Sequence, residues 1–202
     1  AEWFGGVAPE PFVKELRAIT ASTINLRINS PGGSVFAGRA IEQALRDHPA
    51  KVVAHIDGVA ASAAAFVAMG ADEVVMGKGA LMMIHKAWSL AYGNADDLVS
   101  AAALLEKIDS TQVQTFVDRT GQSAEQVSQW LAAETWFTAD EAVAAGFADR
   151  VAEAAPKAQA RWDLSAYANA PQLPADLAAP QQPDRVDAAA LLRRIAVAAL
   201  TD

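Results

Sequence analysis

The segment INLRINSPGGSVFAGRAIEQALRDH, residues 24–48, constrains the fold of this chain most strongly. Its first part, residues 24–28, alternates in polarity and contains β-branched side chains, which predicts a strand. The following NSPGG combines proline with two glycines, so it predicts a turn and excludes a helix. Residues 34–48 then place apolar side chains at helical spacing. A strand, a glycine turn and an amphipathic helix in this order indicate an α/β unit.

The same alternation of strand and helix patterns continues along the chain. Further strands are predicted at 51–58, 73–77 and 81–85, and helices at 9–19, 60–71, 94–121, 123–134 and 138–146. Two of the predicted helices begin with the sequence pattern of a capping box, Ser123 with Gln126 and Thr138 with Glu141. Strands that alternate with helices favour an α/β fold with a mainly parallel sheet and flanking helices.

Composition divides the 202-residue chain into three parts. Residues 1–151 form the predicted domain, and residues 152–186 are rich in Ala, Pro and Gln, which predicts a flexible linker. Residues 187–202 predict a short amphipathic helix suited to docking or oligomerisation. The sequence starts without Met and almost inside a structural element, so we expect an N-terminal strand to be missing from it.

Charge and residue usage exclude several classes of function. A net charge of −8 argues against a nucleic-acid partner. The absence of cysteine excludes disulfides, thiolate nucleophiles and cysteine zinc sites. No signal peptide is visible, and the apolar stretches fall short of the ~20 residues that a membrane helix needs. We therefore expect a cytoplasmic protein with no membrane partner.

Candidate chemistry centres on one serine and one histidine. Ser62 lies among small residues in GVAASAAAF, near the start of a predicted helix, where backbone N–H groups can stabilise a developing negative charge. A serine needs a base, and His85 ends a predicted strand that opens onto a loop. From the residues alone, a serine hydrolase and simple helix packing both remain open, and no acid can be chosen. His55 and Asp57 share a strand face, but two ligands do not make a metal site.

Together these pieces resemble the Clp-type (caseinolytic) serine peptidases, with a Clp/crotonase-like fold. RINSPGGSVFAGRAI, GVAASAAAFVAMGA, LMMIH and FTADEAVAAGFAD occur in the family's order and approximate spacing over residues 24–151. The resemblance implies that Ser62 is the nucleophile and His85 the general base. It places Glu134 at the position of the third triad member, which is usually an aspartate.

The resemblance also implies how a substrate is held. The oxyanion donors correspond to the backbone N–H groups of Gly32 and Ala63, and substrate backbone is expected to pair as an added strand beside NSPGG, at Gly33. This chemistry requires no metal and no cofactor. In the loop KAWSLAYG, Trp88 and Tyr92 are expected to cover the core rather than to line a substrate groove.

The segments AETWFTADEA and GNADDL are most similar to the Clp-like head-maturation proteases of phages and prophages. This implies a homo-oligomer, for which a ring is one candidate form, that cleaves capsid or scaffold protein in the host cytoplasm or the phage prohead. The alternatives are a housekeeping peptidase with an ATP-driven unfoldase, or an inactive capsid-assembly protein. Two further enzymatic alternatives are a crotonase-type acyl-CoA enzyme and a serine–lysine peptidase that uses Lys78 or Lys86.

Overall fold

The structure is a computed structural model that describes residues 7–153, 164 and 167–171. The helix predicted at 187–202 and most of the linker predicted at 152–186 lie outside these residues. Within the described part of the chain, no helix combines the length and apolar character needed to cross a membrane.

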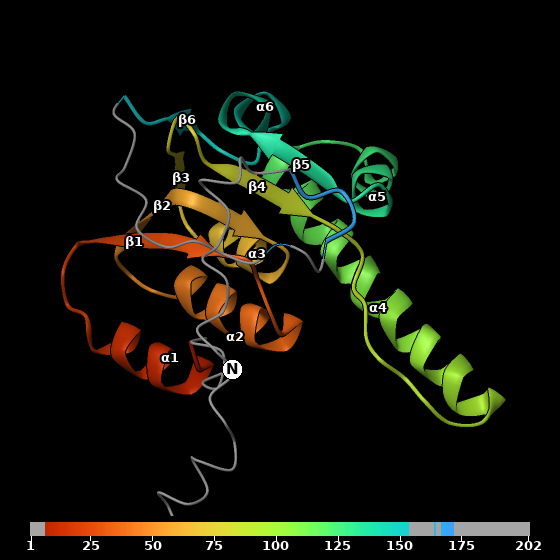
Figure 1. Ribbon diagram of the computed structural model, residues 1–202. Coiled ribbons are helices and arrows are strands. Elements are labelled where there is room, and N and C mark those ends of the chain that lie inside the picture. The colour runs from red at the N-terminus through yellow and green to blue at the C-terminus, as the bar shows by residue number, and fades with distance from the viewer. Residues whose placement is uncertain (1–6, 154–163, 165–166, 172–202) are drawn as a thin grey trace, which may run out of the picture.

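One six-stranded sheet organises the domain (Figure 1). Its strands are β1 (Thr23–Ser30), β2 (Lys51–Ala61), β3 (Glu73–Met76), β4 (Leu81–Ile84), β5 (Thr135–Thr138) and β6 (Arg150–Val151). The strand order is β5-β4-β2-β3-β6, and β1 also pairs with β2. All pairings are parallel except that of β4 with β5, which confirms the predicted mainly parallel sheet.

The long strand β2 pairs with three other strands of this sheet, β1, β3 and β4. Strand β1 pairs with it from Lys51 to Ala60, and β3 pairs with its residues 53–56, in the register Ile56↔Met76. Its last residues pair with β4, in the register Ala61↔Met83. Because β2 and β4 run in parallel here, their carboxyl ends lie side by side, and the residues that follow each strand meet at one edge of the sheet.

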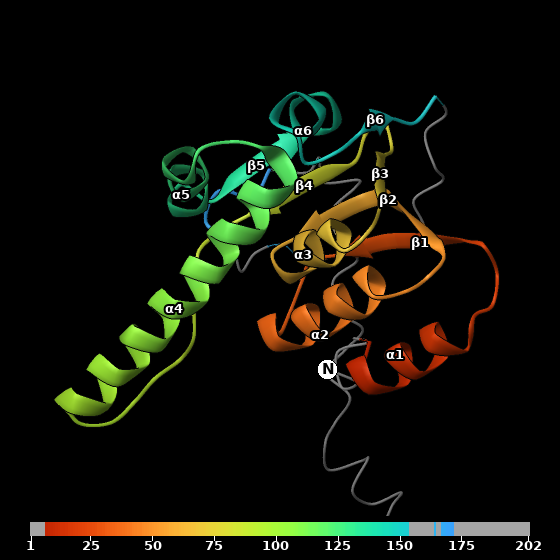
Figure 2. The same ribbon diagram turned by 180° about the vertical axis from the view of Figure 1, so that it is seen from behind.

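Helices flank the sheet. They are α1 (Pro9–Ala18), α2 (Val35–Arg46), α3 (Ala63–Met69), α4 (Ala95–Thr120), α5 (Ala124–Ala132) and α6 (Ala139–Ala145). Figures 1 and 2 show the N-terminal half of α4 extending away from the rest of the domain. The buried residues of α4, Gln112 and Phe116, accordingly lie in its C-terminal half. There Phe116 stacks on Phe66 of α3 with ring centroids 4.9 Å apart.

Three details differ from the sequence-based expectations. The helix predicted at 60–71 begins only at Ala63, because the preceding alanines continue β2. The short strands β5 and β6 were not predicted. The expectation that Trp88 and Tyr92 cover the core is wrong, because their side chains are 64% and 96% exposed.

Candidate active site

Ser62 occupies a sharp turn between β2 and α3. Its φ and ψ are 56° and −123°, a conformation that is strained for any residue other than glycine. The Ser62 N–H donates to the carbonyl of Met83 at 2.9 Å, which ties the turn to the adjacent strand β4. The surrounding pairings therefore hold the strained backbone and present the hydroxyl at the edge of the sheet.

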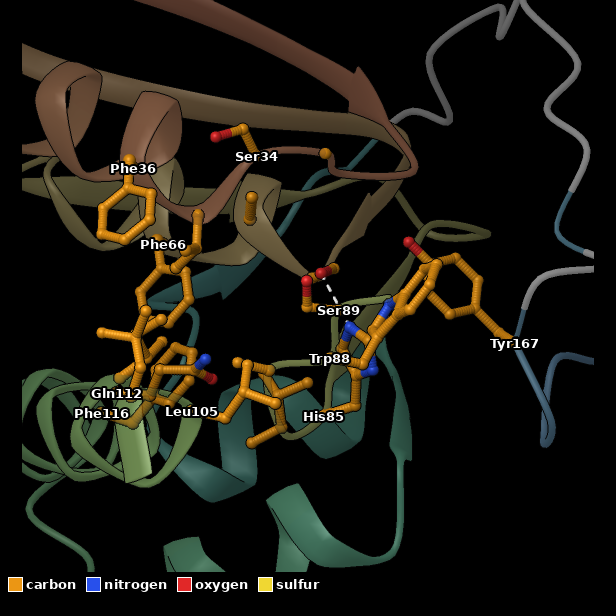
Figure 3. A pocket seen from close by; sticks show the side chains of 18 residues that line it. Ser34, Phe36, Phe66, His85, Trp88, Ser89, Leu105, Gln112, Phe116 and Tyr167 are labelled. Atoms are coloured by element: carbon orange, nitrogen blue, oxygen red, sulfur yellow. Dashed lines mark hydrogen bonds between the residues drawn. The ribbon is translucent and has the colours of Figure 1, made fainter. Parts of the chain in front are cut away.

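His85 directly follows β4 and meets Ser62 at this edge. The His85 Nε2 and Ser62 Oγ atoms lie 2.8 Å apart, a hydrogen bond drawn as the dashed line in Figure 3. Burial lowers the pKa of His85, against the opposing effect of the Glu134 and Asp109 carboxylates. A lowered pKa keeps the imidazole neutral at neutral pH, as a base that accepts the serine proton must be.

The backbone of Gly32 lies directly against this turn. Gly32 has φ +100°, and a Cβ added there would approach the Ala61 carbonyl oxygen to 2.6 Å and the Ala63 nitrogen to 3.0 Å. The structure thus brings together Gly32 and Ala63, the two expected oxyanion donors. The Gly32 N–H donates to the Ser30 hydroxyl at 3.2 Å. The neighbouring Gly33 faces open space.

Glu134 follows α5 with φ 48° and lies near His85 without bonding to it. Within the described residues, its carboxylate accepts hydrogen bonds from the backbone N–H groups of Ala168 at 3.1 Å and Asn169 at 2.6 Å. A longer bond, of 3.4 Å, comes from the Trp136 indole. The structure therefore pairs Ser62 with His85, while the candidate acid is engaged by a different segment of the chain.

Tyr167 is a site residue that sequence reasoning missed. Its ring lies edge-on to His85 with centroids 5.3 Å apart (Figure 3). Its hydroxyl donates to the Pro31 carbonyl. Burial raises the pKa of Tyr167, so the hydroxyl is a neutral donor at neutral pH. The signal that could have found it is its aromatic side chain within the Ala/Pro/Gln-rich stretch, which Tyr167 shares with Trp162.

A pocket of about 380 Å³ opens beside Ser62 and His85, between α2, α3 and α4. Its walls are mostly apolar and include Phe36, Phe66, Leu105, Ile108 and Phe116, whereas Gln112 adds a buried amide (Figure 3). Trp88 lies at the pocket as well, so it lines the candidate groove. The loop that carries it is anchored where the Ala87 N–H donates to Asp109 of α4 at 2.8 Å. The pocket suits an apolar side chain of a ligand next to Ser62 and His85.

The other candidate polar residues lie elsewhere and have different partners. Asp57 pairs with Arg27, and His55 Nε2 lies 3.0 Å from the Asn25 side-chain oxygen. No cluster of three or more metal-ligating side chains occurs among residues 7–153, 164 and 167–171.

Comparison with known proteins agrees with this geometry. The Clp protease family profile matches residues 13–155. The ATP-dependent Clp protease proteolytic subunit 2 of Corynebacterium diphtheriae is 34% identical over 137 residues, covering 65% of this chain and 67% of the relative. Subunit 3 of Rhodococcus jostii is 36% identical over 140 residues, covering 66% and 69%. The chain thus spans about two thirds of the length of these relatives.

A solved structure supports the fold independently. A single-residue mutant of ClpP1 from Listeria monocytogenes superposes with a TM-score of 0.65 at 24% identity, covering 72% of this chain and 84% of that one. The expected Clp fold is therefore confirmed. The family match extends over well more than half of the chain, and we conclude that the chain belongs to the Clp protease family, whose members are serine peptidases.

Proposed function

We propose that this protein is a serine endopeptidase in which Ser62 is the nucleophile and His85 the general base. The observation that carries the proposal is the 2.8 Å hydrogen bond between Ser62 Oγ and His85 Nε2 at a strained strand-to-helix turn. A packing serine needs neither the strained backbone nor an aligned base. The apolar pocket beside the pair supplies room for a substrate side chain.

The reaction follows from these positions. Ser62 Oγ attacks the scissile carbonyl carbon while His85 Nε2 takes its proton, and the N–H groups of Gly32 and Ala63 hold the resulting oxyanion. His85 then donates that proton to the leaving amine, and water releases the acyl group from Ser62 with His85 again acting as base. Glu134 orients His85 through the second ring nitrogen once its carboxylate is free to do so. Substrate backbone pairs beside Gly33.

A fluorophosphonate probe tests this mechanism. The wild-type protein is expected to become labelled on Ser62, and Ser62→Ala and His85→Ala are expected to abolish labelling. Peptide hydrolysis by either variant should fall on the order of 10⁴–10⁶-fold, since the two residues act as a unit. Labelling that persists in Ser62→Ala would refute the assignment of the nucleophile. A wild-type protein that resists the probe and cleaves no peptide would favour an inactive scaffold protein.

The biological setting we propose is head maturation in a phage or prophage, with capsid or scaffold protein as substrate. The similarity of AETWFTADEA and GNADDL to such proteases supports it. The alternative is a partnership with an ATP-driven unfoldase, supported by the names of the ATP-dependent relatives. Cleavage of a folded capsid precursor without ATP supports the first setting, and cleavage that needs an added unfoldase and ATP supports the second.

We also propose that the protein forms a homo-oligomer, with a ring as one candidate form. The extended half of α4 exposes Leu98, Val99 and Leu104 by 46%, 68% and 53%, more than apolar residues of a closed monomer surface usually show together. Sedimentation velocity tests this proposal, and a Val99→Asp variant should shift the protein toward the monomer. A wild-type protein that sediments as a monomer at all concentrations would refute it.

A further inference from the structure

A short C-terminal segment, residues 167–169, is bound at the acid side of the candidate active site. Its donors meet acceptors contributed by two separate loops. The Tyr167 hydroxyl donates to the Pro31 carbonyl, and the Asn169 side-chain amide donates to the Ala133 carbonyl at 2.8 Å. The backbone N–H groups of residues 168 and 169 both donate to the Glu134 carboxylate. Four hydrogen bonds therefore fix the position of the segment on this surface.

The Tyr167 ring adds an apolar anchor. It packs against a small buried cluster formed by Val59, Ala61 and Met83, and it meets the Trp136 ring edge-on with centroids 6.1 Å apart. Aromatic anchors surrounded by satisfied hydrogen bonds are what give a bound peptide its affinity. Bonds from N–H groups to a carboxylate are, in addition, stronger than bonds between neutral groups.

The bound segment has two consequences for the pair Ser62–His85. The Tyr167 ring lies edge-on to His85 and forms part of the wall of the pocket that Ser62 also lines. The Glu134 carboxylate is bonded to backbone N–H groups of the segment instead of to His85. The segment thus lies beside the Ser62–His85 pair and at the same time engages the candidate acid.

We propose that Pro31, Ala133 and Glu134 form a binding site for the chain's own 167–169 segment, which closes the active site until a competing peptide displaces it. The inference rests on the proposed peptidase function for its consequence, but the binding itself does not depend on catalysis. Release of the segment frees Glu134 and uncovers Ser62 in one step. Substrates that present an aromatic side chain and backbone donors in the same arrangement compete best.

The test compares full-length Tyr167→Ala with the wild-type protein. Substitution of Tyr167 removes the anchor and one hydrogen bond and leaves Ser62, His85 and Glu134 in place. Tyr92→Ala is the matched control, because that tyrosine is 96% exposed. The rate at which a fluorophosphonate labels Ser62 is followed by intact mass spectrometry. Because reactivity scales with the fraction of open molecules, we expect labelling of Tyr167→Ala to be about tenfold faster or more, and that of Tyr92→Ala to be unchanged.

A second measurement reads the segment itself. Amide hydrogen exchange at residues 168 and 169 should be slow in the wild-type protein. It should be faster than this in Tyr167→Ala, and also in wild-type protein whose Ser62 carries the probe. Equal labelling of wild type and Tyr167→Ala overturns the closing role and leaves the peptidase proposal intact. Failure of both to be labelled refutes the peptidase proposal, and unprotected amides at 168 and 169 in the wild type refute the binding site.

Discussion

Replacing Gly32 with alanine tests the close approach on which the candidate oxyanion site depends. The φ of +100° at Gly32 disfavours any side chain. A Cβ there would also lie 2.6 Å from the Ala61 carbonyl oxygen and 2.7 Å from the Ser62 Cβ, and real Cβ atoms do not approach other atoms so closely. Both neighbours belong to the turn that carries the candidate nucleophile, so the backbone of that turn must shift.

The expected loss in the free energy of unfolding of Gly32→Ala has two contributions. A side chain held at this φ costs ~1–3 kcal/mol, and forcing a methyl group into a packed site costs a further ~1–3 kcal/mol. Together they lower the free energy of unfolding by about 2–6 kcal/mol. With a urea m-value of ~2 kcal/mol/M, the unfolding midpoint should fall by roughly 1–3 M.

Two other glycines, Gly33 and Gly79, provide controls for these two contributions. Gly33 has φ +149° and open space around its added Cβ, so Gly33→Ala carries the backbone strain of ~1–3 kcal/mol without the clash. Gly79 has neither a positive φ nor a close neighbour, and Gly79→Ala should remain within ~0.5 kcal/mol of wild type. Urea unfolding followed by circular dichroism compares the three variants, and fluorophosphonate labelling reports the displacement of Ser62.

The decisive comparison is between the adjacent glycines. Gly32→Ala should be less stable than Gly33→Ala by the ~1–3 kcal/mol of the clash, and it should also be labelled more slowly. If the two variants unfold at the same urea concentration, Gly32 does not pack on the turn as described. The geometry of the oxyanion site derived from it would then be wrong.

Three further perturbations test the core, a buried carboxylate and the histidine. Phe116→Ala removes a ring that is 1% exposed and should cost ~3–5 kcal/mol in urea unfolding, whereas Phe36→Ala, at 66% exposure, should cost little. Glu42→Gln weakens the bonds that its buried carboxylate accepts from Arg39 at 3.2 Å and Arg46 at 2.7 Å; a loss of ~1–3 kcal/mol is expected by calorimetry, and an unchanged Tm would contradict it. Burial lowers the pKa of His85, so stability present above pH 6.5 should be lost as the pH falls toward the folded pKa. Unfolding of His85→Asn should lack this pH-dependent loss.

Much of the fold could be predicted because strands and helices have different periodicities. The strand at residues 24–28, the glycine turn and the helix at 34–48 all occur where their patterns place them. The end of β2 could not be found this way. Its alanines suit either element, and pairing with β4 decides in favour of the strand. Strand β5 was missed because four residues carry too little pattern, and its structure depends on an antiparallel partner distant in sequence.

The candidate site was predictable in part for a similar reason. Ser62 and His85 each follow a strand, and parallel strands bring their carboxyl ends to one edge of the sheet. The engagement of Glu134 by residues 168 and 169 depends on a segment whose composition predicts only a linker. No local pattern encodes that contact, because four polar donors and one aromatic ring of the segment find their partners across the fold.

The backbone conformation of Ser62, with φ 56° and ψ −123°, bears on how this position tolerates substitution. Glycine would relieve the strain at this turn, whereas alanine would keep it, so selection for folding alone favours glycine here. A copy of this domain that no longer used the hydroxyl would gain stability by losing it. On the proposed function, serine at this position would be retained against the preference of the fold, and the identity of residue 62 in diverged copies would indicate whether the hydroxyl is still in use.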